Sequence, residues 1–438
     1  MKITEFYNTD YVDQASYDNL RKIGSAIDGQ KNASRKVLYT ILEKNIKNEI
    51  KVSQLNSKMA EFAEYLHGDA SGVIVTLAKN YAGTNNIPLL VREGNFGTRF
   101  ANEASAPRYI YTNGSSEFFE LFKKEDTAVL KKQSFEGHEI EPMFYVPALP
   151  MLLINGSEGV SSGFAQKILS REPKKIKKYI TDTLSNSLRP NKSNSLEPYF
   201  EGFNGVVEQG ENSAQWLIKG TIERKGPSTI VITEVPIGYD LKGYINVLDD
   251  LEDRGAFQSY RDLSENDVFK FEVKFKSTDL KKFTDEDVLQ KLKLIKKVTE
   301  NYTAMDSDNK IREFQSAKEI IDYYIDVKLK YLQLRKDNLI QKFDEEIRYD
   351  FSRYLFIKNI VEETLKVNKR KKVDIEQDLN GIENILERDG SYDYLLSMAI
   401  HSLTEERMAK LEQQIKDKKA ELEVLKSTTI EDIWIKEL

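Results

Sequence analysis

The chain has 438 residues, of which 40% are hydrophobic and 31% are charged, enough for two or three domains with cores of their own. The absence of cysteine excludes disulfides and thiolate metal sites, and three histidines argue against a histidine-based metal centre. The net charge of -6 argues mildly against a nucleic-acid binder, because phosphate contacts need clustered lysine and arginine. The distribution of charge therefore matters more than its total.

Basic residues gather in two clusters, one near the start of the chain and one around residue 170. The clusters comprise Lys31, Arg35, Lys36, Lys44, Lys47 and Lys51, and then Lys167, Arg171, Lys174, Lys175, Lys177 and Lys178. A run of charge is most often a solvated helix face, so these clusters favour DNA binding only together with other motifs.

The N-terminal third is predicted to contain helices and loops. Segments Ile23–Leu42 and Met59–Tyr81 carry apolar residues at helical spacing. The first residues lack an apolar signal core, and the longest apolar stretch, near Pro147–Ile154, is too short to span a bilayer. We therefore expect a cytoplasmic protein with no membrane contact.

A glycine-bounded turn at Glu93–Gly97 is followed by the pair Arg108 and Tyr109. Glycine lets the backbone approach a bulky ligand, arginine binds phosphate, and a phenol can act as a nucleophile. An Arg-Tyr pair alone has little weight in a chain with 22 tyrosines. In this order and spacing, however, the two features suggest cleavage of a DNA strand by a tyrosine.

A β-rich module is predicted after a Ser/Asn-rich linker at Ser185–Ser195. Segments Gln215–Thr221 and Thr229–Thr233 flank a turn at Arg224–Pro227, and Phe269–Phe275 alternates with period two.

Two long helices are predicted in the last third. The first begins with a capping box at Ser316–Glu319, and the second begins at Ser402–Glu405; both carry apolar residues at three-to-four spacing. Two such helices running in opposite directions form an antiparallel coiled coil. Residues Val373–His401 lie between them and are expected to form a small globule.

Five blocks occur in a fixed order: DG-K---R-VLY at Asp28–Tyr39, HGD at His67–Asp69, GNFG at Gly94–Gly97, RY at Arg108–Tyr109 and NG--G at Asn155–Gly159. In this order they resemble the breakage-reunion subunit of type IIA DNA topoisomerases, the gyrase A-like family. Segments Pro198–Gly205, Thr233–Pro236 and Tyr394–Trp434 continue the resemblance, and the length is most similar to the medium subunit of T-even-like phage topoisomerases.

The resemblance implies an α+β multidomain fold. Residues 1–148 would form a winged-helix DNA-gate domain with the catalytic tyrosine, and residues 149–312 a β-rich tower domain. Residues 313–438 would form a long antiparallel coiled coil with a small helical C-gate, through which the chain forms a homodimer.

The resemblance also implies the roles of the site residues. Tyr109 would attack the scissile phosphodiester and Arg108 would hold that phosphate, while Arg35 and Lys31 would brace neighbouring oxygens. His67 would act as a hydrogen-bond donor or proton relay. Ile168 matches the isoleucine that the family wedges between base pairs. The further DNA-binding residues are Lys36, Gly94, Asn95, Asn155 and Lys167.

The implied activity is that of the DNA-cleaving subunit of an ATP-dependent type IIA topoisomerase, acting on double-stranded DNA. Such an enzyme makes a transient double-strand break through a 5′-phosphotyrosyl bond, passes a second duplex and reseals, which relaxes or decatenates DNA. The sequence has no P-loop pattern GxxxxGK[ST]. By resemblance, a large partner subunit uses the ATP, and carboxylates of its Toprim fold hold Mg²⁺, so no metal site is expected on this chain. If a phage encodes the chain, it would act in the host cytoplasm.

Two other interpretations remain open at this point. A scaffold of the same fold could bend DNA without cutting it, and intact Arg108 and Tyr109 argue against this alternative. A structural coiled-coil protein would account for the last third and for the acidic balance.

Overall fold

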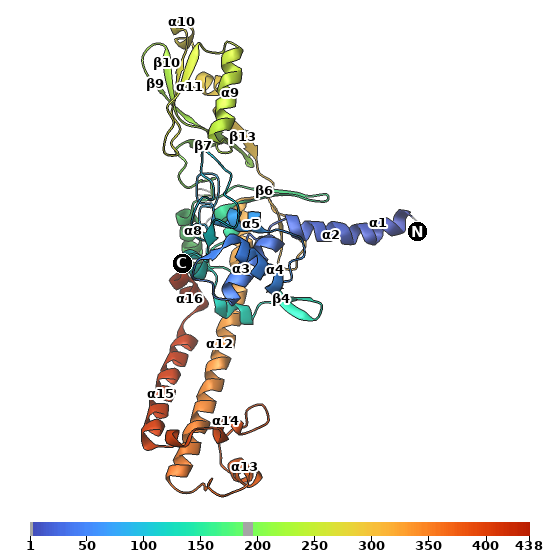
Figure 1. Cartoon of the computed structure of the whole chain (residues 1–438), viewed down its shortest axis with the longest axis vertical. Coiled ribbons are helices and arrows are strands. Elements are labelled where there is room, and N and C mark those ends of the chain that lie inside the picture. The colour runs from blue at the N-terminus through green and yellow to red at the C-terminus, as the bar shows by residue number, and fades with distance from the viewer. Residues whose placement is uncertain (1–2, 187–195) are drawn as a thin grey trace. The chain divides into compact units, whose positions relative to one another are not determined.

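The computed structural model describes residues 3–186 and 196–438, so most of the predicted linker Ser185–Ser195 lies outside the described residues. The chain divides into two compact units (Figure 1). The first contains the residues up to Leu329 together with Glu437–Leu438, and the second is Lys330–Lys436.

The boundary between the units lies later than residue 312, the end of the second predicted domain. The first turns of helix α12 (Ala317–Val361) pack inside the first unit. There the hydroxyl of buried Tyr324 donates to the carbonyl of Pro147, and Nζ of Lys328 donates to the carbonyl of Val146 at 2.7 Å.

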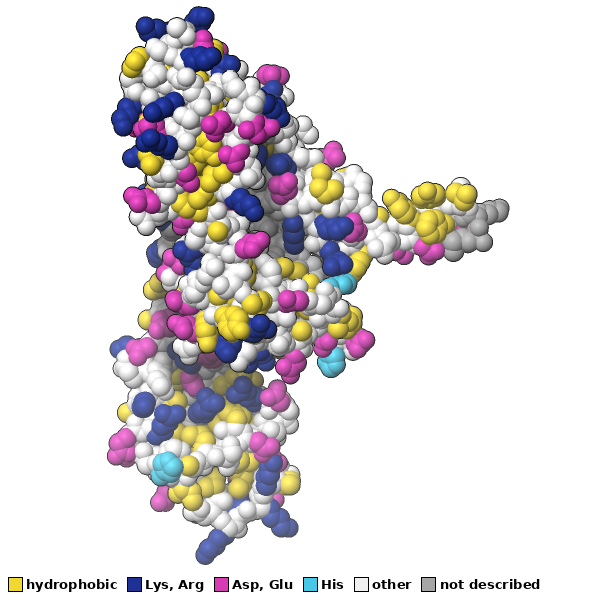
Figure 2. Space-filling view, turned by 45° about the horizontal axis from the view of Figure 1, so that its top comes forward, with side chains coloured by type: hydrophobic (Ala, Val, Ile, Leu, Met, Phe, Trp, Pro, Cys, Tyr) yellow, Lys and Arg dark blue, Asp and Glu magenta, His cyan; other side chains and the backbone are white. Residues whose placement is uncertain are grey.

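The first unit begins with helices α1 (Ile3–Asn8), α2 (Asp10–Lys22), α3 (Asn32–Glu43), α4 (Val52–Phe62) and α5 (Ser71–Ala78). Exposed apolar side chains lie along α1 and α2, as Figure 2 shows: Ile3, Phe6, Tyr7, Tyr11 and Val12.

The predicted helix over Ile23–Leu42 is correct only from Asn32 onward. The preceding residues form a buried turn in which Gly29 has a φ of +67°, and a Cβ there would lie 2.5 Å from the backbone nitrogen of Leu152. Only glycine fits so close to a neighbouring backbone. The segment Met59–Tyr81 is likewise interrupted between α4 and α5, where Gly68 has a φ of +83°.

The short elements that follow frame the candidate site. They are β1 (Ile50–Lys51), β2 (Tyr111–Thr112), α6 (Ser116–Leu121), a 3-10 helix (Lys124–Ala128), β3 (Lys132–Phe135), β4 (His138–Pro142), α7 (Met151–Asn155), β5 (Ser157–Val160), β6 (Ala165–Ile168) and α8 (Pro173–Asn186). Strands β1 and β2, β3 and β4, and β5 and β6 form two-stranded antiparallel sheets.

The predicted β-rich module contains two sheets. One has the order β11-β12-β10-β9, with β9 (Thr221–Arg224), β10 (Thr229–Glu234), β11 (Ser259–Asp262) and β12 (Phe271–Lys274). The other has the order β13-β8-β7, with β7 (Val206–Gln209), β8 (Gln215–Lys219) and β13 (Ile295–Thr299). The two strands predicted to flank one turn, β8 and β10, therefore belong to different sheets, because β9 is the hairpin partner of β10.

Helix α9 (Leu241–Asp253) provides the core of this module together with the first sheet. Tyr244 and Leu248 of α9 belong to the same buried cluster as Phe271 and Val273 of β12. The elements that follow in the first unit are α10 (Ser277–Leu280), α11 (Asp285–Lys291) and the hairpin of β14 (Thr303–Met305) with β15 (Ile311–Glu313).

In the second unit, α12 runs beside α15 (Glu405–Ser427) in the opposite direction (Figure 1), and α16 (Ile430–Glu437) follows α15. Nζ of Lys336 donates to the carbonyl of Lys426 at 3.0 Å, while Asp350, further along α12, pairs with Lys418 at 2.8 Å. Helices α13 (Lys372–Asn380) and α14 (Asp393–Leu396), with a 3-10 helix (Ile400–Ser402), form a small globule with its own apolar core. The predicted antiparallel helix pair and intervening globule are thus present.

No helix in the described ranges is long and apolar enough to cross a membrane.

Candidate DNA-cleavage site

Tyr109 lies on an exposed turn, and 66% of its surface is accessible to solvent. Its backbone nitrogen donates to the carbonyl of Ala106 at 2.9 Å. The guanidinium carbon of Arg108, which is also exposed, lies 5.0 Å from the centre of the Tyr109 ring. The structure therefore brings a phenol and a cation together where a large ligand can reach both.

The turn at Glu93–Gly97 supports this segment. Tyr111 lies two residues after Tyr109. Its backbone exchanges hydrogen bonds of 3.0 and 2.9 Å with the backbone of Glu93. Gly94 has a φ of +99°, and a Cβ there would lie 3.1 Å from the side chain of Ile110. The side chain of Asn95 accepts a hydrogen bond from the Gly97 nitrogen at 2.9 Å. Gly94 and Asn95, predicted to bind DNA, thus shape the loop that holds Tyr109 in place.

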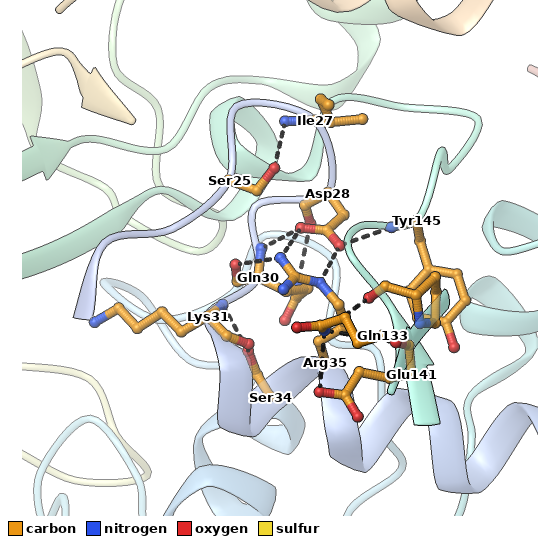
Figure 3. A network of polar contacts seen from close by, with 11 residues as sticks. Ser25, Ile27, Asp28, Gln30, Lys31, Ser34, Arg35, Gln133, Glu141 and Tyr145 are labelled. Carbon is orange, nitrogen blue, oxygen red and sulfur yellow. Dashed lines mark hydrogen bonds and ion pairs between the residues drawn. The ribbon is translucent and has the colours of Figure 1, made fainter. Parts of the chain in front are cut away.

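Arg35 is paired in the interior of the first unit. Its guanidinium is buried and donates to both carboxylate oxygens of Asp28, at 2.8 and 3.1 Å, and to the carbonyl of Gln30 at 3.0 Å (Figure 3). Burial alone lowers the pKa of this group, but the facing carboxylate of Asp28 outweighs it and raises the pKa. These hydrogen bonds anchor α3 to the buried turn, and the contact of Arg35 with phosphate oxygens stays a prediction.

Lys36 is also part of the interior rather than of a DNA-binding surface. Its ammonium pairs with the buried carboxylate of Glu141 at 2.8 Å and donates to the carbonyl of Ala63. A buried charge needs such a partner, so moving Lys36 to a phosphate would leave Glu141 uncompensated. The predicted DNA contact of Lys36 stays a prediction, and it would require this ion pair to open.

Lys31 points away from the buried Asp28–Arg35 pair, as Figure 3 shows. Its Nζ donates to the carbonyl of Glu158 at 2.6 Å. It lines a cavity of about 870 Å³ that also contains Lys167, Asn155 and Ile168. Four residues from three separate sequence motifs thus meet in one place, whereas Tyr109, Arg108 and His67 are not among the described residues that line this cavity.

The cavity is strongly basic. Its lining includes the cations Arg21, Lys31, Lys79, Arg99, Lys167 and Lys296. Among the described residues that line it, Glu158 is the one acid. We call this feature the basic cavity.

Burial disfavours the charged form of three cations of the basic cavity. Burial lowers the pKa of Lys31, against a smaller opposing effect of Glu158. The pKa of Lys296 is lowered by burial and then by the charge of Lys167, and burial likewise lowers the pKa of Arg99. A lowered lysine pKa means that the protein disfavours the charged form, so an incoming anion would relieve an existing strain.

Asn155 lines the basic cavity but has a structural role. Its amide accepts from the backbone nitrogen of Ile87 at 2.9 Å and donates to the carbonyl of the same residue at 2.8 Å. Both ends of the side chain therefore hold α7 against the segment that precedes the Glu93–Gly97 turn.

Ile168 is only 3% exposed, so it cannot enter a base stack in this conformation. The same hairpin carries a different apolar side chain, Val160, which is 74% exposed beside the turn between β5 and β6. The wedge role of Ile168 therefore stays a prediction, and insertion into DNA would require this side chain to leave its present packing.

His67 is exposed on the loop between α4 and α5. Its Nε2 shares a hydrogen bond with the hydroxyl of Tyr17 in α2, and its ring lies 5.8 Å from the ring of Tyr65. The structure therefore links this histidine to the N-terminal helices.

The sequence analysis did not predict a buried hydrogen-bond network around Glu300. One carboxylate oxygen accepts from the Leu169 nitrogen and from Arg171, each at 2.8 Å, and the other accepts from Arg171 at 2.7 Å, Trp216 at 2.8 Å and Tyr302 at 2.7 Å. Arg171, counted with the second basic cluster, is thus paired in the interior. The remaining lysines of that cluster on α8, Lys174, Lys175, Lys177 and Lys178, are exposed.

Among residues 3–186 and 196–438, no group of three or more His, Cys, Asp or Glu side chains is placed to hold a metal ion.

Comparisons with known proteins find DNA gyrases and DNA topoisomerases. Residues 21–438 match the family model that describes the A subunits of DNA gyrase and topoisomerase IV. The chain is 31% identical over 447 residues to the mitochondrial DNA topoisomerase 2 of Dictyostelium discoideum, covering 99% of this chain and 34% of that protein. It is also 31% identical over 492 residues to DNA topoisomerase 2 of Saccharomyces cerevisiae, again with 99% and 34% covered.

A solved structure is similar over the same length. It is the crystal structure of the Plasmodium falciparum topoisomerase II DNA-binding, cleavage and re-ligation domain, with a TM-score of 0.89 and 31% identity, covering 99% of this chain and 63% of that one. The chain spans about a third of the length of the curated relatives, which are eukaryotic enzymes. On the match of the family model to nearly the whole sequence, this chain belongs to the family of DNA gyrase and topoisomerase IV A subunits.

Proposed function

We propose that this chain is the DNA-breaking part of a type IIA topoisomerase, with Tyr109 as the nucleophile. The observation that carries the proposal is the exposed Tyr109 beside Arg108 on a turn anchored to Glu93–Gly97. A phenol packed in a core could not reach a duplex, whereas this one can.

The proposed reaction exchanges one phosphodiester for another. The Tyr109 oxygen attacks the scissile phosphorus and loses its proton, while the bond from phosphorus to the 3′ oxygen breaks and that oxygen takes up a proton. The product is a 5′-phosphotyrosyl ester and a free 3′-hydroxyl. Since the new ester has roughly the energy of the old bond, the 3′-hydroxyl can reverse the step and reseal the strand.

Arg108, His67 and the basic cavity are proposed to stabilise charge in this reaction. Arg108 can donate two hydrogen bonds to the phosphate, whose negative charge grows in the transition state. His67 is proposed as a hydrogen-bond donor or proton relay, with Tyr17 holding its Nε2. The basic cavity, with Lys31 and Lys167, is proposed to bind neighbouring backbone phosphates, because clustered cations are what phosphates require.

Ile168 is proposed for the wedge role, as the family resemblance implies. An apolar side chain inserted between base pairs costs a few kcal/mol of unstacking, and the resulting bend lets the duplex contact more basic surface. Ile168 follows Lys167 on strand β6, and both residues line the basic cavity. Insertion of Ile168, which is 3% exposed in the free chain, would therefore require a local rearrangement and would bring phosphates toward the basic cavity.

We further propose the domain assignment that the family resemblance implies. The first part of the first unit would be the winged-helix DNA gate, the module around α9 the tower, and the second unit the coiled coil with a C-gate that joins two copies. Two copies are needed because each tyrosine can cut only one strand.

ATP hydrolysis and Mg²⁺ binding are assigned to a partner. We propose an ATPase/Toprim large subunit, so that this chain acts as a separate breakage subunit like the phage medium subunit. This assignment follows the family resemblance alone. Mg²⁺ held by the Toprim carboxylates would add positive charge at the scissile phosphate.

A denaturant-quenched cleavage assay on supercoiled plasmid tests the proposal. The full chain is combined with Mg²⁺ and the ATPase/Toprim partner, and wild type is compared with Tyr109→Phe. Tyr111→Phe serves as the control, because Tyr111 is also exposed and lies two residues away. We expect protein-linked linear DNA with wild type and the control, and none with Tyr109→Phe. Adducts formed by Tyr109→Phe would refute the assignment, and tight DNA binding without adducts in wild type would favour a non-catalytic bending scaffold.

A further inference from the structure

The loop that leads to Tyr109 has no regular structure of its own. The structure describes all of residues 95–106 and shows no helix or strand among them. Near the ends of the loop, the backbone nitrogen of Ser105 donates to the carbonyl of Asn95 at 2.9 Å. The position of the residues in between therefore depends on contacts with other elements.

Arg99 lies in the middle of this loop and is buried against the β-rich module. Its Nη1 donates to the carbonyl of Tyr239 at 2.9 Å, and its Nη2 donates to the carbonyls of Val235 at 3.0 Å and Pro236 at 3.4 Å. The carboxylate of Glu234 lies 3.7 Å from Nη2. One side chain thus joins the loop to backbone atoms that are 136 to 140 residues away in sequence.

The acceptors belong to the segment that connects strand β10 to helix α9, which includes the motif Thr233–Pro236. The Glu234 carboxylate accepts from the backbone nitrogens of Val235 at 2.9 Å and Asn204 at 3.2 Å. These hydrogen bonds fix the backbone of the motif. The motif can therefore offer its carbonyls to the guanidinium of Arg99 in a constant arrangement.

Phe100 adds an apolar contact with the same module. Its ring centre lies 5.0 Å from that of Phe269, which belongs to the buried core of the module. The guanidinium carbon of Arg99 lies 5.2 Å from the centre of the same Phe269 ring. The carbonyl of Phe100 accepts from the nitrogen of Leu241, the first residue of α9, at 3.2 Å. Two consecutive loop residues are thus attached to the module.

The loop on either side of Arg99 is tightly packed. The turn Thr98–Ala101 is closed by a hydrogen bond of 2.8 Å from its first nitrogen to its last carbonyl. Gly97 has a φ of +88°, and a Cβ there would lie 2.6 Å from the carbonyl oxygen of Asn102. Close-packed atoms transmit a displacement instead of absorbing it, so a shift at Arg99 should reach Tyr109.

We propose that Arg99 is a positioning residue for Tyr109: it fixes the loop to the β-rich module, so that the placement of the nucleophile depends on that module. This inference rests on the proposed function, in which Tyr109 attacks DNA. A misplacement of about 1 Å can slow a reaction about a hundredfold, so loss of this anchor should lower the rate of cleavage and not the affinity for DNA.

The test measures cleavage per bound duplex. The full chain is mixed with a short labelled duplex, Mg²⁺ and the ATPase/Toprim partner, and the initial rate of protein-linked DNA is divided by the amount of duplex bound. Arg99→Met removes the hydrogen bonds and is expected to lower this rate about ten- to a hundredfold. Unfolded protein binds no duplex, so a mere loss of stability would leave the rate per bound duplex unchanged. Arg254→Met changes a 71% exposed arginine side chain beyond α9 and should cleave like wild type.

Two measurements distinguish positioning from phosphate binding, since Arg99 also lines the basic cavity. Arg99→Met should leave the slope of log affinity against log salt unchanged, and a slope smaller by about 1 would show that Arg99 contacts a phosphate. Arg99→Lys keeps the charge but loses the planar fork that reaches several carbonyls, so it is expected to cleave nearly as slowly as Arg99→Met. A lysine variant with the wild-type rate would overturn the proposal.

Hydrogen exchange without DNA tests the anchor separately. The amides of Thr98 and Ser105 should exchange faster in Arg99→Met than in wild type or Arg254→Met, and unchanged exchange would refute the anchoring role. If wild type cleaves and Arg99→Met cleaves equally fast per bound duplex, the inference about Arg99 is wrong and the role of Tyr109 stands. If wild type forms no adduct with the partner present, the proposed function itself fails.

Discussion

Replacing Glu300 with glutamine should loosen the join between strand β6 and the β-rich module. Glu300 and Arg171 are 0% and 1% exposed, and the carboxylate accepts five hydrogen bonds. Both carboxylate oxygens of Glu300 accept hydrogen bonds, whereas glutamine has one acceptor oxygen and one donor amide. Glutamine can therefore accept hydrogen bonds from the donors at only one of these two positions. If its oxygen faces Trp216 and Tyr302, its amide protons face the donors of Leu169 and Arg171.

The magnitude follows from burial. Removing one partner of a buried ion pair leaves the other charge uncompensated, and this typically costs about 3–5 kcal/mol. Because an exposed pair is worth under about 1 kcal/mol, Glu211→Gln is a suitable control. Glu211 pairs with Lys297 at 2.8 Å, but its side chain is 80% exposed.

Hydrogen exchange followed by mass spectrometry measures the effect locally, because the Leu169 amide donates to Glu300. A loss of about 3–5 kcal/mol in local opening free energy accelerates exchange by a factor on the order of a hundred to a few thousand. The peptide containing Leu169 should show this acceleration in Glu300→Gln and not in Glu211→Gln. Unchanged protection in Glu300→Gln would refute the view that the ionised carboxylate holds this network together.

Three further predictions concern the DNA-binding surface. Lys167→Met should reduce the slope of log affinity against log salt by about 1, measured by fluorescence anisotropy; an unchanged slope would mean that Lys167 contacts no phosphate. Bound phosphate favours the charged form of Lys31, whose pKa is lowered in the free chain, so DNA affinity should be full below that lowered pKa and fall as pH rises through it. A titration from about pH 7 to pH 10 checks this, and Lys31→Met should remove that part of the pH dependence; an identical profile in the variant would contradict it. Val160→Ala should change the free energy of unfolding by under about 0.5 kcal/mol because the side chain is exposed, and a larger loss in urea unfolding would show that Val160 belongs to the core.

Local patterns were enough to predict several elements. The alternating segment Phe269–Phe275 contains strand β12, and the helix starts predicted near Ser316 and Ser402–Glu405 match α12 and α15. Ser316 and Thr404 each accept a hydrogen bond from a backbone nitrogen three residues later, as N-caps do. These signals lie within a few residues of the structure that they specify.

The burial of several basic residues depends on partners that are distant in sequence. Lys36 pairs with Glu141, 105 residues away, and Arg171 pairs with Glu300, 129 residues away. The sequence shows that such residues are charged, but it does not show that each is buried beside an opposite charge. Likewise, only the pairing of β5 with β6 shows that Val160, and not Ile168, lies beside the turn of the hairpin.

The basic cavity makes the charge distribution of the chain uneven. Six cations and one acid lie there, in a chain whose total charge is -6, so the rest of the chain is more negative than the total suggests. The net charge of the remaining residues therefore opposes a polyanion, while the charge of the basic cavity attracts it. Such a field orients the partners before contact and raises the rate of productive encounters, an advantage that fades as salt shortens its range.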